Sequence, residues 1–253
     1  MSNGYGFGGG DEVKEESSWR YPLGIFMATL VLCAIFLYYY VGPSVEEIRG
    51  DVPSPAITEE PVSIQISGHA FAPAANFTVY PRARRGGART EVSLYALWPT
   101  MSGYSPAHRK EFIENEPQTR RLDILVSKRE STFSEAQRFE ILYLPQTTDQ
   151  RGVRTPYQLT KFSFKEQRTS VPTNGYSATE LFVGTDESDN MIALFCFKER
   201  EDIPSPECWR TYEYSDNIEV TYRFKRPYLP EWRAIDSEIR NFVTEMDRTN
   251  AAG

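Results

Sequence analysis

An apolar segment near the start of the chain, RYPLGIFMATLVLCAIFLYYYVGP, constrains its fold more than any other feature. Leu23 to Val41 contain no charged residue. About 19 residues that rise about 1.5 Å each match the roughly 30 Å hydrocarbon core of a bilayer. The segment is apolar all round, whereas a helix buried in a protein core usually keeps a polar stripe. We therefore predict one transmembrane helix over residues 20–42.

The end of this segment argues against a cleaved signal peptide. A secretory signal has a shorter apolar run, about 7–15 residues, and ends in small residues at its cleavage site. Here the run ends in Tyr38, Tyr39 and Tyr40, which is typical of an aromatic belt at a membrane surface. Bulky Leu32 precedes Cys33, where a lipoprotein signal needs a small residue. We expect the helix to stay in the protein as an anchor.

The charges that flank the helix favour a cytoplasmic N-terminus by a small bias. Lys14 and Arg20 precede the helix and only Arg49 follows it closely, and positive charge is enriched on the cytoplasmic side. No later segment is apolar enough to span a membrane, so we expect the rest of the chain to lie on the other side. The expected parts are a disordered cytoplasmic tail rich in Gly, Ser and acids, a Pro-rich linker and an extracytoplasmic domain, over residues 1–19, 43–61 and 62–253.

Cys196 and Cys208 are the two cysteines outside the membrane segment, and they lie 12 positions apart. No further ligand is near them for a zinc site, and their spacing is too wide for a C-x-x-C redox pair. We predict that they form a disulfide, which for a loop of this size stabilises the fold by roughly 3 kcal/mol. Two buried free thiols are the alternative. Because a disulfide requires an oxidising compartment, it favours a domain outside the cytoplasm. The single uncleaved tether with its tyrosine belt is typical of a bacterial inner-membrane protein, so we expect a periplasmic domain.

Residues from Val62 onward alternate between apolar and polar side chains, as half-buried strands do. Two pairs of such runs flank short polar turns, DESDN and SDN, and each pair predicts an antiparallel hairpin. Together they predict a four-stranded meander whose two middle strands are joined by the disulfide. Further strands are expected in TEVSLYALW, around Leu122 and in YQLTKFSFK.

Three helices are expected among these strands. Ser105 and Pro106 resemble a cap followed by a first-turn proline, and Ser134 with Gln137 resembles a capping box. The residues after Gln137 also alternate as a strand would, so this segment stays ambiguous. The last helix is amphipathic, with one apolar face formed by Trp232, Ile235, Ile239, Phe242, Val243 and Met246. The sequence therefore predicts an α+β domain, mostly antiparallel, with an amphipathic C-terminal helix.

The sequence shows no local signature of a catalytic nucleophile. It has no G-x-S-x-G elbow, and its two histidines, His69 and His108, fit a turn and the surface of a helix. A Ser–His–Asp/Glu triad stays open as an alternative, because its members can lie far apart in the sequence. The cluster Asp186, Glu187 and Asp189 fits a hairpin tip. We expect no catalytic, metal or cofactor site.

The strongest local charge feature is the segment YPRARRGGAR, which contains Arg82, Arg84, Arg85 and Arg89. Such a loop can bind an acidic protein partner or an anionic lipid, and a solvated connection between strands is the alternative. Nucleic acid is not expected as a partner. From Ser44 onward the chain has 26 basic and 31 acidic residues, a net charge of about −5, because 2 of the 28 basic and 4 of the 35 acidic residues precede it. A nucleic-acid binder usually has a basic footprint.

These features predict an interaction protein more than an enzyme. The chain combines a membrane anchor with a folded domain and shows no catalytic constellation. We expect an accessory, assembly or scaffold subunit of a membrane or envelope complex that binds a protein partner. The alternative is an envelope hydrolase or transferase that uses carboxylates or a triad.

Overall fold

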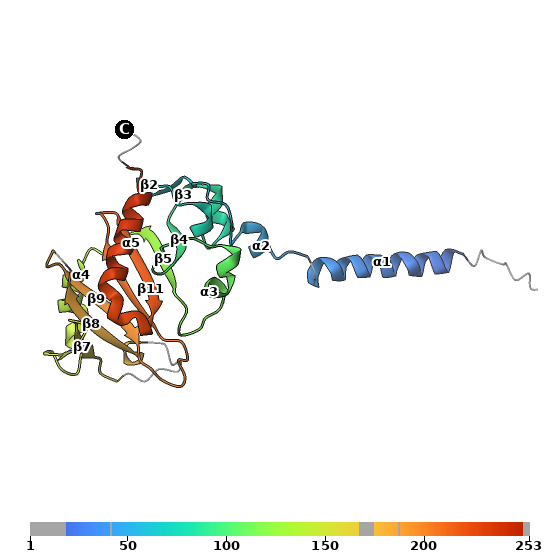
Figure 1. The fold of residues 1–253 in the computed structure, drawn as a ribbon. Coiled ribbons are helices and arrows are strands. Elements are labelled where there is room, and N and C mark those ends of the chain that lie inside the picture. Colours follow the sequence, from blue (N-terminus) through green and yellow to red (C-terminus); the bar gives the residue numbers. More distant parts are fainter. Residues whose placement is uncertain (1–18, 41, 167–174, 187, 250–253) are drawn as a thin grey trace, which may run out of the picture. The chain divides into compact units, whose positions relative to one another are not determined.

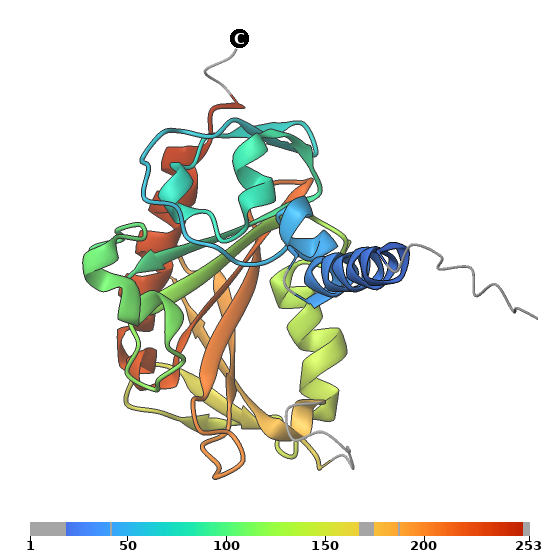
Figure 2. The ribbon, with the colours of Figure 1, turned by 90° about the vertical axis from the view of Figure 1, so that its right-hand side faces the viewer.

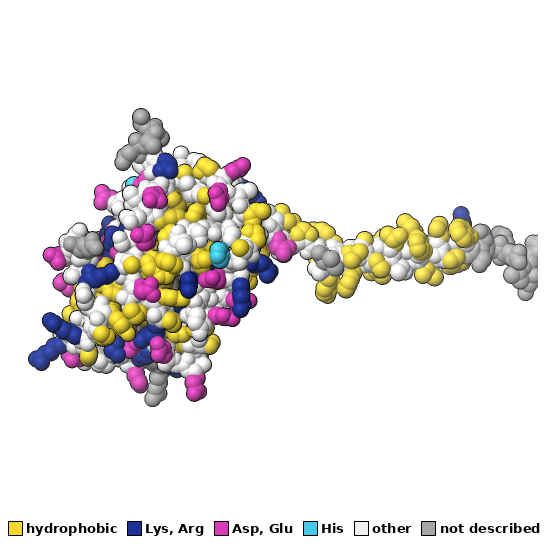
Figure 3. Space-filling model, in the orientation of Figure 1, with side chains coloured by type: hydrophobic (Ala, Val, Ile, Leu, Met, Phe, Trp, Pro, Cys, Tyr) yellow, Lys and Arg dark blue, Asp and Glu magenta, His cyan; other side chains and the backbone are white. Residues whose placement is uncertain are grey.

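The computed structural model describes residues 19–40, 42–166, 175–186 and 188–249. The chain divides into two units, Met1–Ile48 and Arg49–Gly253. The first unit contains the helix α1 (Arg20–Tyr40), which has 21 residues, none of them buried, and is long and apolar enough to cross a membrane. Figure 3 shows hydrophobic side chains along its whole length. The predicted membrane helix is present as a candidate span, and the predicted tail lies almost wholly outside the described residues.

The second unit is built on two sheets (Figure 1). A small sheet has the order β2-β1-β3, and a large one has the order β4-β5-β11-β10-β9-β8-β7-β6. Every neighbouring pair in the large sheet is antiparallel, so the predicted α+β class with a mostly antiparallel sheet is confirmed. The strands are β1 (Ile64–Ile66), β2 (His69–Phe71), β3 (Gly87–Arg89), β4 (Glu91–Leu97), β5 (Arg121–Lys128), β6 (Val153–Arg154), β7 (Thr160–Ser163), β8 (Thr179–Thr185), β9 (Met191–Phe197), β10 (Glu207–Glu213) and β11 (Ile218–Lys225).

In the second unit, all helical segments except the C-terminal helix α5 are short. The α-helices of this unit are α2 (Val45–Arg49, which begins in the first unit), α3 (Arg109–Ile113), α4 (Glu135–Gln137) and α5 (Trp232–Met246). The predicted capping box is present, because the Ser134 and Gln137 side chains each accept a backbone N–H from the other residue. The ambiguous segment after it is helical and forms a π-helix, η4 (Arg138–Tyr143).

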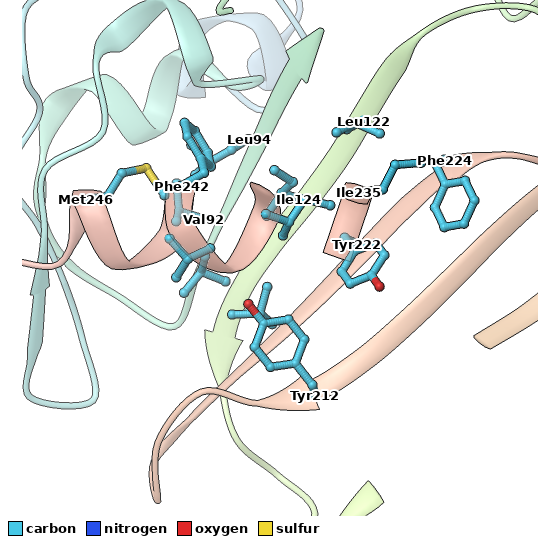
Figure 4. Close-up of a cluster of buried hydrophobic side chains, with 14 of the residues drawn as sticks. Val92, Leu94, Leu122, Ile124, Tyr212, Tyr222, Phe224, Ile235, Phe242 and Met246 are labelled. Carbon is cyan, nitrogen blue, oxygen red and sulfur yellow. The ribbon is translucent and has the colours of Figure 1, made fainter. Parts of the chain in front are cut away.

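The helix α5 packs on one face of the large sheet. Its predicted apolar face is buried throughout, against alternate side chains of β4, β5, β10 and β11. Figure 4 shows side chains of these strands and of α5 converging on one cluster. Burial of each large apolar side chain stabilises the fold by about 1.5–3 kcal/mol, so this face forms the main core.

Two smaller clusters lie on the opposite face of the sheet. The segment from α4 to Leu144 packs on β7, β8 and β9 through aromatic side chains, and α3 packs on β4 through Phe112, which contacts Tyr95. In Figure 2, α5 (red) and the α4–η4 segment (yellow-green) lie on opposite sides of the strands. On this face, the central strands β5, β11 and β10 lie between the two clusters and are only partly covered.

The large sheet separates partly between β9 and β10. These strands pair only at Cys208 with Cys196 and at Trp209 with Phe195. Beyond that point, side chains of the α4–η4 segment form hydrogen bonds with backbone groups of the two strands. The Glu135 carboxylate accepts the Ala193 N–H at 2.7 Å, and the Arg138 guanidinium donates to the Thr211 carbonyl at 2.9 Å. The lost ladder bonds are replaced, because buried backbone groups must be paired.

The second unit includes the segment that precedes its first strand. Residues 49–61, expected to be linker, lie along the domain: the N–H of Ser54 donates to the Val79 carbonyl at 3.1 Å, and the N–H of Asn76 donates to the Thr58 carbonyl at 2.9 Å. Gly50 has a φ of 78°, and a Cβ at this position would lie 2.7 Å from the Arg82 nitrogen. A proline-rich composition favours an extended chain, and an extended chain can also pack against a domain.

Candidate functional site

The side of the sheet opposite α5 is partly exposed over β5, β11 and β10. Residues of these strands alternate between buried and half-buried or exposed, and the buried set faces α5. The other set forms a surface that we call the open face. Its residues are Asp123, Leu125 and Ser127 on β5, Glu219, Thr221 and Arg223 on β11, and Trp209, Thr211 and Glu213 on β10.

Trp209 and Arg223 form the most distinctive pair on the open face. They are directly opposite in the register of β10 and β11, and the Arg223 guanidinium carbon lies 5.7 Å from the centre of the indole ring. Arg223 is exposed and forms no ion pair with any residue that the structure describes. Its other neighbour in register, Asp123, is paired with Arg121 at 3.0 Å. Arg223 is therefore a cation without a carboxylate, supported by an aromatic ring.

Aromatic stacking holds Trp209 in place. The Phe195 ring stacks on it with centroids 5.7 Å apart, and the Phe197 centroid lies 4.9 Å away. Phe195 also stacks on Phe164 across the sheet. The disulfide between Cys196 and Cys208 joins the rung next to Trp209 and Phe195. The half-buried indole is thus held by a rigid support.

The open face carries several acidic side chains. Glu213 and Glu219 are directly opposite each other, and like charges at this spacing are unfavourable, but Arg138 forms an ion pair with Glu213 at 3.2 Å. Burial raises the pKa of Glu219; Arg138 opposes the shift and the charge of Glu130 adds to it. Burial likewise raises the pKa of Asp123, against the lowering effect of Arg121.

The four arginines that the sequence singled out lie in the 3-10 helix η2 (Pro81–Arg85) and in β3. Arg82 forms ion pairs with Asp51 at 3.1 Å and with Glu91 at 3.4 Å. Arg89 donates to the Gly86 carbonyl at 3.3 Å and to the Arg82 carbonyl. Both side chains therefore support the local backbone.

Arg84 joins the N-terminal segment of the domain to its sheet. Its guanidinium donates to the Thr78 hydroxyl at 2.9 Å, to the Thr78 carbonyl at 3.1 Å and to the Ser54 carbonyl. Arg85 is exposed and lines, with Arg84, a groove of about 590 Å³ whose other walls include Ser63 and Glu60. The structure thus brings the four arginines together, and Arg82, Arg84 and Arg89 stabilise the local fold through their ion pairs and hydrogen bonds.

Within the described ranges, no group of three or more His, Cys, Asp and Glu side chains could hold a metal ion. His69 and His108 lie in different elements, β2 and the 3-10 helix η3 (Pro106–His108). Lys225 is buried and donates to Glu207 at 2.6 Å.

Sequence reasoning missed the open face. The alternation of apolar and polar residues in β10 and β11 is the signal that could have placed Trp209 and Arg223 on one side of the sheet. Which side a helix covers depends on contacts between distant segments, and no local pattern reports that.

Comparisons with known proteins show the fold. No protein-family model matches this chain, and no curated protein matches it. A solved structure described as an immunity protein of the Stenotrophomonas maltophilia type IV secretion system, Smlt3025, superposes with a TM-score of 0.53. The match covers 75% of this chain and 94% of that chain, with 12% sequence identity. The α+β domain therefore shares its overall architecture with that protein.

Proposed function

We propose that this protein is a single-pass, membrane-anchored interaction module whose α+β domain lies outside the cytoplasm and binds a protein partner. The observation that carries the proposal is the Trp209–Arg223 pair on the open face, in which Trp209 is half-buried and Arg223 is exposed. Trp and Arg are enriched among residues that dominate protein interfaces, and here the two side chains contact each other on a rigid aromatic support. The role is that of an accessory, assembly or scaffold subunit of an envelope complex.

The structural neighbour suggests a more specific form of this proposal. That protein is an immunity protein of a secretion system, and fold likeness alone does not carry a function across. By analogy, the domain of this chain would bind and hold a secreted protein at the periplasmic side of the inner membrane. The disulfide supports this location, since it requires an oxidising compartment.

The open face would be tested by purification of the tagged full-length chain in a mild detergent, followed by identification of copurifying proteins. The double variant Trp209→Ala/Arg223→Ala should reduce recovery of the specific partner at least about tenfold. The control is Arg233→Ala, because Arg233 also lies over a tryptophan, Trp232, at 4.6 Å, but belongs to α5. Equal recovery with wild type and with both variants would show that the open face is not the interface.

The arginine segment is a second proposed contact, for an acidic surface of the partner or an anionic lipid. Arg85 is exposed at the groove, and exposed charges are screened over about 8 Å at physiological salt. The Arg85→Gln variant should lower partner recovery at low salt and have little effect at high salt. If partner recovery with Arg85→Gln equals that of wild type at low salt, the arginine segment does not bind the partner.

A further inference from the structure

Three side chains that are far apart in the sequence meet beside the turn between β10 and β11. Ser215 lies in this turn, which spans residues 214–217. His69 is the first residue of β2, and the two-residue turn before it, Ser67-Gly68, has φ angles of 48° and 91°, as a tight hairpin requires. Asp247 follows α5 and bridges to Phe71 on β2. Three elements of the fold thus converge on one imidazole ring.

The distances resemble those of a nucleophile, a base and an acid in series. The Ser215 hydroxyl oxygen lies 3.0 Å from Nε2 of His69. On the other side of the ring, Nδ1 lies 3.4 Å from the Thr249 hydroxyl oxygen and 3.7 Å from a carboxylate oxygen of Asp247. The distance to Asp247 is longer than a hydrogen bond, but catalytic hydrogen bonds are often long before substrate binds. The His69 and Asp247 side chains are 23% and 17% exposed, so the cluster is accessible from solvent.

Asp247 is held by its neighbours in the ionised form. The Tyr214 hydroxyl and the Thr249 N–H both donate to its carboxylate at 2.8 Å. Burial opposes the charged form, yet the hydrogen bonds from Thr249 and Tyr214, with the charge of His69, outweigh it and lower the pKa of Asp247. An ionised carboxylate beside Nδ1 stabilises the imidazolium that forms when His69 accepts a proton.

Backbone donors are present next to the serine. Ser215 is half-buried, while Asp216 and Asn217 after it are exposed. The N–H groups of Asp216 and Asn217 have no backbone acceptor in the described part of the chain. The N–H of the residue after a nucleophile is a frequent donor to the oxyanion of an acyl-transfer intermediate.

We propose that Ser215 and His69, with Asp247 as positioning residue, form a second site that hydrolyses small carboxylic esters. The Ser215 oxygen would attack the ester carbonyl carbon while its proton passes to Nε2 of His69, and the bond to the alcohol would break as the alcohol takes that proton. Water would then attack the acyl-serine and give a proton to His69, and His69 would return it to the Ser215 oxygen as the acyl–oxygen bond breaks and the acid leaves. The surface position favours acyl groups that need no deep pocket.

The chain contains its own control for this proposal. Ser105 and His108 also form a serine–histidine pair, 3.1 Å apart, but through Nδ1 of the ring. His108 has no ion pair with a carboxylate among the described residues. This second pair therefore has the same two residue types without the third member, and its serine should not be activated.

The test uses the purified full-length chain in detergent, a fluorophosphonate probe and p-nitrophenyl acetate. The probe should label wild type, with loss of fluoride and formation of one oxygen–phosphorus bond. Peptide mapping of the labelled wild-type protein should place that bond on Ser215, and this measurement requires no substitution. Ser215→Ala should abolish labelling and ester hydrolysis, and Ser105→Ala should behave as wild type.

The role of Asp247 has a separate readout. Asp247→Asn should lower hydrolysis at least about tenfold and shift the pH–rate profile, whereas a purely structural role would leave the profile unchanged. Absence of labelling in folded wild type, or unchanged labelling of Ser215→Ala, would overturn the proposal. Neither result bears on the open face, because partner recovery is measured independently.

Discussion

Arg210 on β10 and Glu135 on α4 form a bidentate ion pair in the interior, although 75 residues separate them. The Arg210 guanidinium donates to the two carboxylate oxygens at 2.9 and 2.7 Å, and also to Asp236 on α5 at 2.5 Å. Arg210 is 1% exposed. Burial raises the pKa of Glu135 while Arg210 opposes the shift, and the carboxylates raise the pKa of Arg210 despite its burial. Arg210 thus links α4, on one face of the sheet, to α5, on the other face, where β9 and β10 are no longer paired.

Replacement of Arg210 by Ala should strongly destabilise the domain. It would leave Glu135 and Asp236 buried without their cation, and removal of one partner of a buried ion pair costs about 3–5 kcal/mol. Denaturant unfolding of the full-length chain in detergent measures this loss. Arg200→Ala is the control, because the exposed Arg200–Asp202 pair should contribute at most about 1 kcal/mol. Equal losses in the two variants would contradict a structural role for the buried cluster.

The difference between the predicted and the observed parts of the fold follows from the range of the interactions. Local periodicity predicted the two C-terminal hairpins and α5, because turn residues and apolar spacing act within a few positions. The packing of residues 49–61 could not be predicted, since it depends on contacts with Asn76 and Val79. The buried charge of Arg210 could not be predicted either. Arg210 occupies a position of β10 where the alternation would place an apolar residue. Its partners Glu135 and Asp236 belong to α4 and α5, which are distant in the sequence.

Cys196 and Cys208 should be recovered as linked peptides from protein digested without reduction. Their sulfur atoms are bonded at the directly opposite positions of β9 and β10. Reduction should lower the unfolding free energy by roughly 3 kcal/mol, as expected for a loop of this size. A Cys33→Ser variant is the control, because it leaves this pair as the chain's only cysteines. Rapid alkylation of both thiols in that native variant would contradict the disulfide and weaken the periplasmic assignment.

The stability of the domain should fall in acid through Glu180. Burial opposes its charged form, but Arg226 at 2.5 Å and Lys161 at 3.2 Å outweigh burial and lower the pKa of Glu180 from its ordinary 4.5. A lowered carboxyl pKa contributes stability that is complete above about pH 4.5 and lost as the pH falls through the folded value. The midpoint of thermal unfolding should therefore drop less steeply below pH 4.5 in Glu180→Gln than in wild type. Glu201→Gln, at an exposed position, should retain the wild-type slope, and identical slopes in all three proteins would refute the assignment.

The anchor should remain uncleaved and the domain should be accessible from outside the cytoplasm. Intact purified protein should begin at or near Met1 rather than after Tyr40, since α1 is an uninterrupted apolar helix of 21 residues. Protease added to spheroplasts should digest the domain, whereas a cytoplasmic marker protein should survive. A domain digested only after the membrane is permeabilised would reverse the proposed orientation.

Arg84 should hold the first residues of the domain against the sheet. Its guanidinium donates to both oxygens of Thr78 and to the carbonyl of Ser54, and hydrogen bonds of charged groups contribute about 1.5–3 kcal/mol. Arg84→Gln should therefore lower the unfolding free energy by roughly 2 kcal/mol and speed cleavage near Ser54 in limited proteolysis. Arg154→Gln, on the exposed edge strand β6, is the matched control and should match wild type in both measurements. If Arg84→Gln also matches wild type, the arginine segment does not stabilise the domain start, and binding becomes the better explanation of its charges.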